Sequence, residues 1–300
     1  MAPEPLLPMQ NREIIGQWSE SAPYWERYRP VIVGMFLPVA QALIEDAGIV
    51  TGNSVLDVAT GPGEPALTIA DLVGAKGMVV GTDVAPEMVE AARREAAQRK
   101  LTHVSFEVAF TDSLPFPSNT FDAAVSRFGV MFFPSPVDCL REMLRVLKPG
   151  GRIALAVWHL AENNPFDYVV SRVVDRYMAR YVEAATPKPG SSDMFRFATP
   201  GDLLTLLANA GARGVSERVL RFSIRAGLSA EDFWTLRSGM SEKLRTKLAL
   251  LPEPNRAELK QDAIEAIRAY SVENGISIPA EVLIVSGAKP DEAGDLQEAR

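Results

Sequence analysis

The chain has 300 residues and a mass of 32.7 kDa, with 47% hydrophobic and 23% charged residues, which is the composition of a globular protein with a sizeable core. Lys and Arg number 31 against 38 Asp and Glu, and the net charge of −7 argues against the basic surface that nucleic-acid binding needs. One cysteine, Cys139, excludes an intramolecular disulfide, and two histidines exclude a His-rich metal site, so no metal is expected.

Residues 11–50 are predicted to be helical and are rich in aromatic side chains. We expect this segment to form an N-terminal lid, in which Trp18 or Tyr24 contacts a bound ligand. Packing against a sheet is the simpler alternative for most of its aromatic residues. The apolar run from Val31 to Ile44 is shorter than the ~20 residues that a membrane helix needs, so no membrane span is expected.

From residue 54 to residue 157 the sequence alternates between β-rich runs and helical segments. Strands are predicted at residues 54–58, 78–82, 104–108, 123–126 and 153–157. Helices are predicted from Pro86, where proline stands in the first turn, and from Pro136 to Leu147. This alternation indicates βαβ units, and hence an α/β fold with a mostly parallel sheet and helices on both faces.

Residues 159–288 contain predicted helical insertions and the last strands. Helices are expected at 166–182, 201–210, 230–251 and 257–273, and strands at 218–224 and 281–287. A loop at 184–192 and a polar tail at 289–300 complete the chain. Because no linker divides these segments, we expect a single domain over residues 1–300, with a ligand-binding core at 51–158.

The most informative stretch follows the first predicted strand and reads DVATGPGEP over residues 57–65. In an open α/β sheet, ligands bind at the carboxyl ends of the strands, where Gly61 and Gly63 let the backbone approach them closely. Asp83 ends the second strand, 20 residues after Gly63, where it can accept hydrogen bonds from both hydroxyls of a ribose. We therefore predict a site for an adenosine-containing cofactor, against the structural alternative of a tight turn and a helix cap.

A dinucleotide is one possible cofactor, because Gly61 to Ala66 can be read as G-x-G-x-x-A. Two features argue against it. The carboxylate of Asp57 suits a cationic amino group better than a pyrophosphate, and Pro62 and Pro65 remove N–H donors that a pyrophosphate needs.

Four segments carry a family resemblance: VLDVATGPGEPALTIA (55–70), VVGTDVAPEMVEAAR (79–93), LPFPSNTFDAAVSRFGVMFF (114–133) and LREMLRVLKPGGRIALAVW (140–158). They resemble the class I S-adenosylmethionine-dependent methyltransferases, in particular the group of the ubiquinone and menaquinone biosynthesis methyltransferases. The resemblance implies a Rossmann-like, doubly wound sheet of seven strands whose last strand is antiparallel. It also implies S-adenosyl-L-methionine as the cofactor.

The resemblance further implies roles for single residues of the cofactor site. They are the backbone of Ala59, Gly61, Pro62 and Gly63 for the methionine part, Asp57 for its ammonium group, Asp83 for the ribose, Val84 and Met88 for the adenine, and Arg127 at the border. After the third strand the group usually has Asp or Asn, a small residue and an acid, where this chain has Phe110, Thr111 and Asp112. Either Asp112 or the backbone alone then contacts the adenine amine.

The chemistry needs few protein groups, because the cofactor carries the reactivity and a base is required only where the acceptor must lose a proton. His159 follows the fifth predicted strand and is the candidate base, since histidine exchanges protons near neutral pH. A hydrogen-bonded histidine at the rim of the sheet is an equal alternative. The residues at the strand ends form either the substrate wall or core, and they are Phe128, Met131, Phe132 and Trp158.

These observations favour methyl transfer to a small, largely apolar metabolite such as a phenol, a quinone precursor or a polyketide-like ring. A nicotinamide-dependent oxidoreductase and a non-catalytic S-adenosylmethionine-binding protein are the alternatives. The first would need a Tyr-x-x-x-Lys pair, but Tyr168 is followed by Arg172. We expect a cytoplasmic protein with a small-molecule acceptor and no nucleic-acid partner. A homodimer is kept as one alternative for the oligomeric state, because such dimers are common among soluble enzymes.

Overall fold

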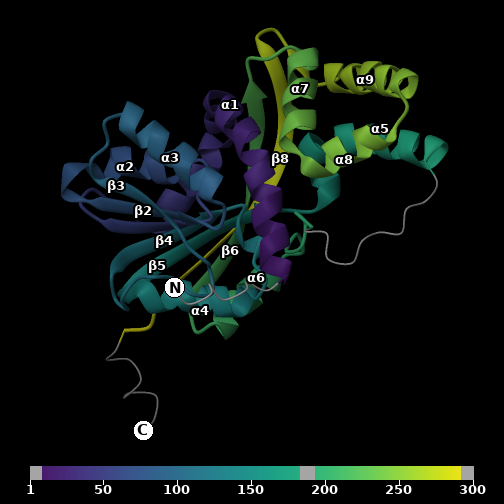
Figure 1. Ribbon diagram of the computed structural model, residues 1–300. Helices are drawn as coiled ribbons and strands as arrows, with labels where there is room; N and C mark the ends of the chain where they lie inside the picture. The colour runs from purple at the N-terminus through teal and green to yellow at the C-terminus, as the bar shows by residue number, and fades with distance from the viewer. Residues whose placement is uncertain (1–8, 183–192, 292–300) are drawn as a thin grey trace, which may run out of the picture.

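The computed structural model describes residues 9–182 and 193–291, so the predicted loop at 184–192 and the tail from residue 292 lie outside it. Figure 1 shows a sheet with helices on both sides. The described helices are α1 (Met9–Asp46), α2 (Ala66–Val73), η1 (Gly74–Lys76), α3 (Pro86–Gln98), η2 (Val130–Phe132), α4 (Pro136–Val146), η3 (Ala161–Asn163), α5 (Pro165–Tyr181), α6 (Asp202–Asn209), α7 (Ala230–Met240), α8 (Glu242–Leu250) and α9 (Glu253–Arg268). The strands are β1 (Ser54–Val58), β2 (Met78–Asp83), β3 (Val104–Val108), β4 (Phe121–Arg127), β5 (Leu147–Trp158), β6 (Arg213–Ala226), β7 (Ser271–Val272) and β8 (Gly275–Ala288).

Seven strands form one sheet in the order β3-β2-β1-β4-β5-β8-β6, and the short β7 pairs with β8 beside them. β1 to β5 are parallel, whereas β8 is antiparallel to both β5 and β6. The predicted seven-stranded sheet with its last strand antiparallel is therefore confirmed, and β7 is an addition. The strand order reverses between β1 and β4, and the carboxyl ends of these two strands form the switch point at which such sheets bind ligands.

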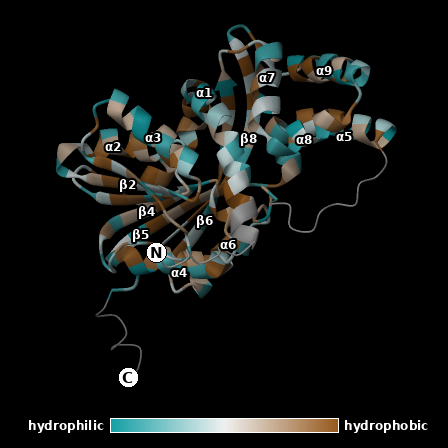
Figure 2. Cartoon of the chain, viewed as in Figure 1, coloured by the Kyte–Doolittle hydropathy of each residue, from teal (hydrophilic) through white to brown (hydrophobic). Residues whose placement is uncertain are grey.

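Helices cover both faces of the sheet. α1, α2 and α3 lie on one face, and α4 packs with α6 on the other (Figure 1). Because both faces are covered, the inner strands are apolar without alternation, and Val55, Leu56 and Val58 of β1 are fully buried. In Figure 2 brown gathers on the inner strands of the sheet, whereas brown and teal alternate along the helices.

β6 and β8 are longer than predicted and form a two-stranded extension of the sheet, over residues 221–226 and 275–281. β5 pairs with β8 only as far as Trp158 opposite Val282, while β6 and β8 stay paired up to Ala226 opposite Ile276. α5 and α7 pack on this β6–β8 extension, and α9 packs on both of them. The extension thus carries the helical insertion beyond the carboxyl edge of the sheet.

The single helix predicted at 230–251 is wrong, because α7 and α8 are separate helices. Ser241 between them has an extended backbone, and its hydroxyl accepts a hydrogen bond from the Leu244 N–H at 3.3 Å, so Ser241 caps α8. The helix predicted at 257–273 begins earlier and ends at Arg268. Ser271 and Val272 instead pair with β8 as β7.

α1 joins the sheet to the insertion. Its second half packs on the sheet through buried side chains such as Phe36. Its middle is tied to α3 by an ion pair between Arg29 and Glu95 at 2.8 Å, and its first half is tied to α8 by a hydrogen bond from Arg245 to the Ser21 hydroxyl at 3.2 Å. The predicted N-terminal helix is confirmed, while its role as a lid stays a prediction.

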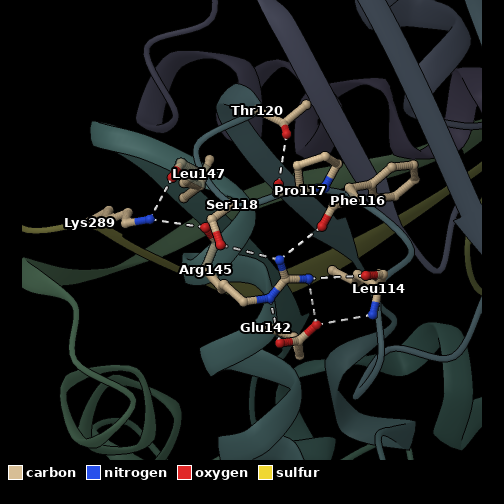
Figure 3. A network of polar contacts seen from close by, with 9 residues as sticks. All are labelled: Leu114, Phe116, Pro117, Ser118, Thr120, Glu142, Arg145, Leu147 and Lys289. Carbon is tan, nitrogen blue, oxygen red and sulfur yellow. Dashed lines mark hydrogen bonds and ion pairs between the residues drawn. The ribbon is translucent and has the colours of Figure 1, made fainter.

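The segment between β3 and β4 is held at the amino edge of the sheet, opposite to the carboxyl ends of the parallel strands. Side chains around Arg145 hold it there (Figure 3). The guanidinium of Arg145 donates to the carbonyls of Phe116 at 2.8 Å and Leu114 at 3.0 Å, and its Nε donates to Glu142 at 2.7 Å. Lys289 Nζ donates to the carbonyl of Arg145 at 2.9 Å. The first residue of the predicted polar tail is therefore bound to the amino edge of the sheet.

Candidate functional site

The loop after β1 contains three residues at positive φ, which are Ala59 at 59°, Gly61 at 55° and Gly63 at 107°. A Cβ atom on Gly63 would come within 2.8 Å of Leu67 Cδ1 and 3.2 Å of Ala92 Cβ, so glycine is needed for the loop to pack against α2 and α3. A Cβ atom on Gly61 would meet no described atom within 4 Å. The Gly61 loop (residues 59–64) is therefore packed at Gly63 and open at Gly61, where a ligand can approach the backbone.

Asp57 is fully buried in β1 beneath this loop. Its Oδ2 accepts hydrogen bonds from the Thr60 hydroxyl at 2.6 Å and from the Ala66 N–H at 3.0 Å, whereas its Oδ1 has no hydrogen-bond partner in the described structure. Burial raises the pKa of Asp57 to about 7, against the opposing effects of the Thr60 hydrogen bond and the charge of Arg127. A buried carboxylate oxygen without a donor fits the ammonium group of an amino-acid ligand.

Asp83 ends β2 and is bound to the same loop. Its Oδ2 accepts a hydrogen bond from the Gly61 N–H at 2.9 Å, and its Oδ1 accepts one from the Ala85 N–H at 3.0 Å. Burial raises the pKa of Asp83 to about 6, although the backbone hydrogen bonds oppose the rise. A carboxylate has about four acceptor positions, so Asp83 positions the loop and keeps capacity for the hydroxyls of a ribose.

Arg127 connects the end of β4 to the Gly61 loop. Its Nη2 donates to the carbonyl of Glu64 at 3.2 Å, and its Cζ lies 5.9 Å from the ring centroid of Phe36. Burial lowers the pKa of Arg127, and the charges of Glu64 and Asp57 oppose this effect. The predicted border residue therefore lies among the acidic groups beneath the loop.

The residues predicted to surround the adenine differ in their environments. Met88 is 2% exposed and packs with Ala22 and Ala85, next to Trp18 and Trp25. Val84, one residue after Asp83, is half-buried.

The segment after β3 places its three predicted residues apart. The Thr111 hydroxyl lies 3.0 Å from the Sγ of Cys139 on α4, so Thr111 points into the core. Phe110 is half-buried and Asp112 is exposed. Both alternatives for the adenine amine, Asp112 or the backbone alone, therefore stay predictions.

A group of aromatic rings begins at the carboxyl ends of β4 and β5. Phe128 stacks on Trp158 with ring centroids 4.7 Å apart at 10°, and Trp158 stacks on Phe166 of α5 at 5.8 Å and 16°. Phe36 of α1 lies edge-on to all three. We call these four residues the aromatic cluster. The φ of Phe128 is 61°, an uncommon conformation for a bulky residue and of the kind found at functional sites.

Two members of the aromatic cluster, Phe36 and Phe166, were not predicted as site residues. Both stand on helices, where an apolar side chain at helical spacing indicates a residue of the hydrophobic core and not a residue of a binding site. The remaining predicted wall residues are divided: Trp18 lies edge-on to Phe132 at 5.2 Å, whereas Met131 is 2% exposed within the core. Tyr24 lies under the guanidinium of Arg245 at 4.6 Å, on the side of the insertion.

His159 follows β5, and its Nδ1 lies 2.8 Å from a carboxylate oxygen of Glu281 on β8. Asn163 donates to the same oxygen at 3.0 Å, and Arg221 donates to the other at 2.8 Å. Burial raises the pKa of Glu281, but the hydrogen bonds from His159 and Arg221 outweigh burial and lower it. His159 Nε2 makes no hydrogen bond to a described residue. The His159 N–H also donates to the carbonyl of Glu281 at 3.1 Å, so both the backbone and the side chain of His159 are bound to Glu281.

A hollow of about 760 Å³ opens at the far tip of the β6–β8 extension, beside Ser229, Gln261 and Asn274. It contains none of the predicted site residues. Among residues 9–182 and 193–291, no group of three His, Cys, Asp or Glu side chains is placed to hold a metal ion. Within the same residues, no helix combines the length and apolarity that a membrane crossing requires.

Comparison with known proteins agrees with this geometry. Residues 55–151 match the family model of a methyltransferase domain. The chain is 32% identical over 197 residues to the ubiquinone/menaquinone biosynthesis C-methyltransferase UbiE of Azotobacter vinelandii, covering 62% of this chain and 75% of the relative. It is 38% identical over 122 residues to the aklanonic acid methyltransferase DauC of Streptomyces sp. (strain C5), covering 41% of this chain and 56% of that protein.

The matched regions are partial. The chain spans about half the length of several curated relatives that it matches, between 51% and 56%. Among solved structures, the YcgJ protein from Bacillus subtilis is similar with a TM-score of 0.52 and 19% identity, over 84% of this chain and 98% of that chain. At this identity the structural likeness demonstrates a shared fold.

Proposed function

Because this chain belongs to the class I S-adenosylmethionine-dependent methyltransferases, we propose that it transfers a methyl group from S-adenosyl-L-methionine to a small, largely apolar metabolite. The observation that carries the proposal is the buried, unpartnered Oδ1 of Asp57 beneath a loop that is open at Gly61. An acidic oxygen in this place favours a ligand with a cationic amino-acid group and disfavours a pyrophosphate.

The bound cofactor supplies a methyl group on a sulfonium, so the protein has mainly to orient its two ligands and exclude water. The backbone of the Gly61 loop and the Oδ1 of Asp57 would hold the amino-acid part. Asp83 would hold the ribose, and Val84 and Met88 would pack against the adenine. Each of these groups is positioned by contacts within the chain, and the carboxylate of Asp83 is hydrogen-bonded directly to the Gly61 N–H.

Within the aromatic cluster Phe36, Trp158 and Phe166 are 4–5% exposed, whereas Phe128 is half-buried, so Phe128 is the member that supports an acceptor with a planar, apolar ring. Phe128 and Trp158 stand at the strand ends, and Trp18 of α1 lies edge-on to Phe132 of η2 as a separate aromatic pair. The two relatives described above act, by their names, in ubiquinone and menaquinone biosynthesis and on aklanonic acid. We therefore propose a phenol, a quinone precursor or a polyketide-like ring as the acceptor class.

His159 is the proposed base for an acceptor that must lose a proton. Its Nδ1 is held by Glu281, which orients the ring and leaves Nε2 for the proton. It follows Trp158 beyond the end of β5 and is bound to Glu281, so a role in transfer requires the acceptor to extend past the end of β5.

The test uses the purified full-length chain in two steps. Isothermal titration measures binding of S-adenosylmethionine and, separately, of NAD and NADP. Transfer of labelled methyl groups is then measured on a catechol, a naphthohydroquinone and a hydroxyanthraquinone. Binding together with transfer is the expected result. The absence of S-adenosylmethionine binding contradicts the proposal, and binding without transfer to any acceptor supports a non-catalytic binding protein instead.

A further inference from the structure

Two segments meet at the switch point of the sheet, the Gly61 loop after β1 and the Phe128 turn (residues 128–132) after β4. Ala59 in the loop and Phe128 in the turn both have a positive φ, at 59° and 61°, although neither is glycine. This conformation costs such residues free energy and persists only where the surrounding structure holds it. Gly129, which follows Phe128, is buried against Ala59. The contact between the loop and the turn therefore has a strained residue on each side.

The glycine at position 129 is required by space and not by its backbone conformation. Its φ of −96° is accessible to any residue. A Cβ atom there would lie 2.6 Å from the Cβ of Ala59 and 2.6 Å from the hydroxyl oxygen of Ser126. Because carbon atoms in contact are normally about 3.5–4.0 Å apart, alanine at this position would push the turn and the loop apart by about 1 Å.

The Gly61 loop is the more firmly held of the two segments. The Thr60 hydroxyl and the Gly61 N–H donate to two buried carboxylates, at 2.6 Å and 2.9 Å. The Phe128 turn is joined to β5 by a backbone hydrogen bond from Phe128 to the carbonyl of Ala156 at 2.9 Å. A Cβ atom at position 129 is therefore expected to displace Phe128 and not the loop.

A ligand can reach both sides of this contact. Ala59, Gly61 and Phe128 are half-buried, and a Cβ atom on Gly61 would meet no described atom within 4 Å. Trp158 stacks on the ring of Phe128, and no other ring in the described part of the chain does so. The half-buried ring of Phe128 thus gives an acceptor a place of contact next to the loop proposed for the cofactor.

We propose that Gly129 is a positioning residue, which lets the Phe128 turn lie directly on Ala59 and so fixes the distance between the ring of Phe128 and the Gly61 loop. This inference rests on the proposed function and adds to it the residue that sets the spacing of acceptor and cofactor. Spacing matters in an in-line methyl transfer, because a reactant misplaced by about 1 Å can lose about 100-fold in rate.

The test uses 2-naphthol, a planar phenol, as the probe. Isothermal titration measures the dissociation constant of S-adenosylhomocysteine and, in its saturating presence, that of 2-naphthol. Gly129→Ala is expected to weaken 2-naphthol binding by about threefold to tenfold, the worth of one aromatic contact, and to leave the affinity for S-adenosylhomocysteine unchanged. If S-adenosylhomocysteine does not bind the unsubstituted protein, the proposed function fails. If it binds but 2-naphthol does not, or if Gly129→Ala changes both affinities or neither, only the Gly129 inference fails.

Gly77→Ala is the matched control at the amino edge of the sheet. Gly77 precedes β2 with a φ of −97°, and its Cβ atom would lie 2.6 Å from the carbonyl oxygen of Asn53 and 2.6 Å from the Cβ of Val73. This variant is expected to lower the free energy of unfolding and to leave both dissociation constants unchanged. A loss of 2-naphthol affinity equal to that of Gly129→Ala would reveal general destabilisation and overturn the inference.

A second background tests whether the effect passes through the contact with Ala59. Ala59→Gly and Ser126→Ala together remove the two atoms that crowd position 129, and the Ser126 hydroxyl has no hydrogen-bond partner in the described structure that would be lost. When Gly129→Ala is added to this double variant, it is expected to weaken 2-naphthol binding by less than about twofold. An equal loss in both backgrounds contradicts the inference.

Thermal unfolding identifies any variant that fails to fold. If Gly129→Ala does not fold, Phe128→Asn decides the question, because asparagine tolerates a positive φ and lacks the ring. Phe128→Asn is expected to lose about threefold to tenfold in 2-naphthol affinity, and Phe128→Tyr to lose less. Since the inference requires this ring to contact the acceptor, an unchanged affinity in Phe128→Asn overturns it.

Discussion

The Gly61 loop and the aromatic cluster lie at the same edge of the sheet, yet they are assembled in opposite ways. The loop is held by polar contacts between near neighbours in sequence, such as those of Asp57 with Thr60 and Ala66. The aromatic cluster takes Phe36 from α1 and Phe166 from α5, and it is held by ring packing. The loop is thus specified by one short segment and its adjacent strand, whereas the cluster exists only once distant helices have docked.

This difference teaches how one fold can keep its cofactor and change its acceptor. Substitutions of Phe36 on α1 or Phe166 on α5 alter the cluster without touching the hydrogen bonds of the Gly61 loop. The polar site is also independent of the network around Arg145 at the amino edge of the sheet (Figure 3). We therefore expect cofactor affinity and acceptor affinity to respond to different substitutions.

The largest effect is expected for His159→Ala. This variant tests whether a residue outside both the Gly61 loop and the aromatic cluster takes the proton from the acceptor. Loss of a general base lowers the rate of transfer to a phenol by about 100- to 10,000-fold, with the affinity for S-adenosylmethionine unchanged. Single-turnover transfer and isothermal titration measure the two quantities. His103→Ala is the control, because His103 precedes β3 at the amino edge, where its Nε2 lies 2.8 Å from the Ala70 carbonyl. Equal rates in both variants would remove His159 from the mechanism.

We expect Asp57, which lies beneath the Gly61 loop, to make the free energy of unfolding depend on pH. Its pKa is raised from 3.8 to about 7, so between these values the folded state keeps a proton that the unfolded state has released. The stabilisation is present below pH 3.8 and is lost as the pH rises through 7, on the order of 4 kcal/mol in total. Asp83, with its pKa raised to about 6, acts in the same direction.

Asp57→Asn tests this contribution, because asparagine cannot ionise. Urea unfolding of the ligand-free protein at pH 4 and pH 8 is expected to show a smaller loss of stability in the variant. The variant is also expected to bind S-adenosylmethionine more weakly at pH 8, since an amide replaces the carboxylate that faces the ammonium group. An identical pH dependence in both proteins would contradict the raised pKa of Asp57 in the folded state.

Two glycines of one loop are expected to separate stability from binding. Gly63→Ala places a Cβ atom 2.8 Å from Leu67 at a φ of 107°, and we expect it to lower the free energy of unfolding by about 3 kcal/mol. Gly61→Ala has space for its Cβ atom and costs about 1 kcal/mol for its positive φ, but it fills the opening and weakens cofactor binding. Urea denaturation measures the free energy of unfolding of both variants, and isothermal titration measures their affinity for S-adenosylmethionine. A Gly61→Ala variant with full cofactor affinity would show that the ligand does not approach the backbone at Gly61.

The smallest effect is expected in the aromatic region. Phe166→Leu removes ring contacts with Trp158 and Phe36 and lowers the free energy of unfolding by about 1 kcal/mol. The KM for an aromatic acceptor is expected to rise, while the affinity for S-adenosylhomocysteine stays the same. Phe116→Leu is the matched control at the amino edge, where Phe116 lies edge-on to Phe121 at 5.2 Å. A shared change in KM would show that the effect is general destabilisation.

The cofactor side of the site was open to prediction from the sequence because its signals are local. The strand before Gly61, the glycines that permit positive φ and the acid that ends the next strand all lie within residues 54–83. The structure joins them directly, with Asp83 hydrogen-bonded to the Gly61 N–H. The acceptor side offered weaker signals, since Phe36 and Phe166 look like ordinary helix residues until α1 and α5 are packed together.

The sequence by itself determined the mostly parallel sheet and the place of the cofactor loop, because periodicity and glycine conformation act over short distances, whereas the antiparallel last strand was implied by the family resemblance. Only the tertiary structure decided that β6 and β8 extend past the sheet and that Ser241 separates α7 from α8. It also decided that Trp158 faces the aromatic cluster while His159 turns to Glu281. These features depend on contacts between segments far apart in the chain, which no local pattern of residues contains.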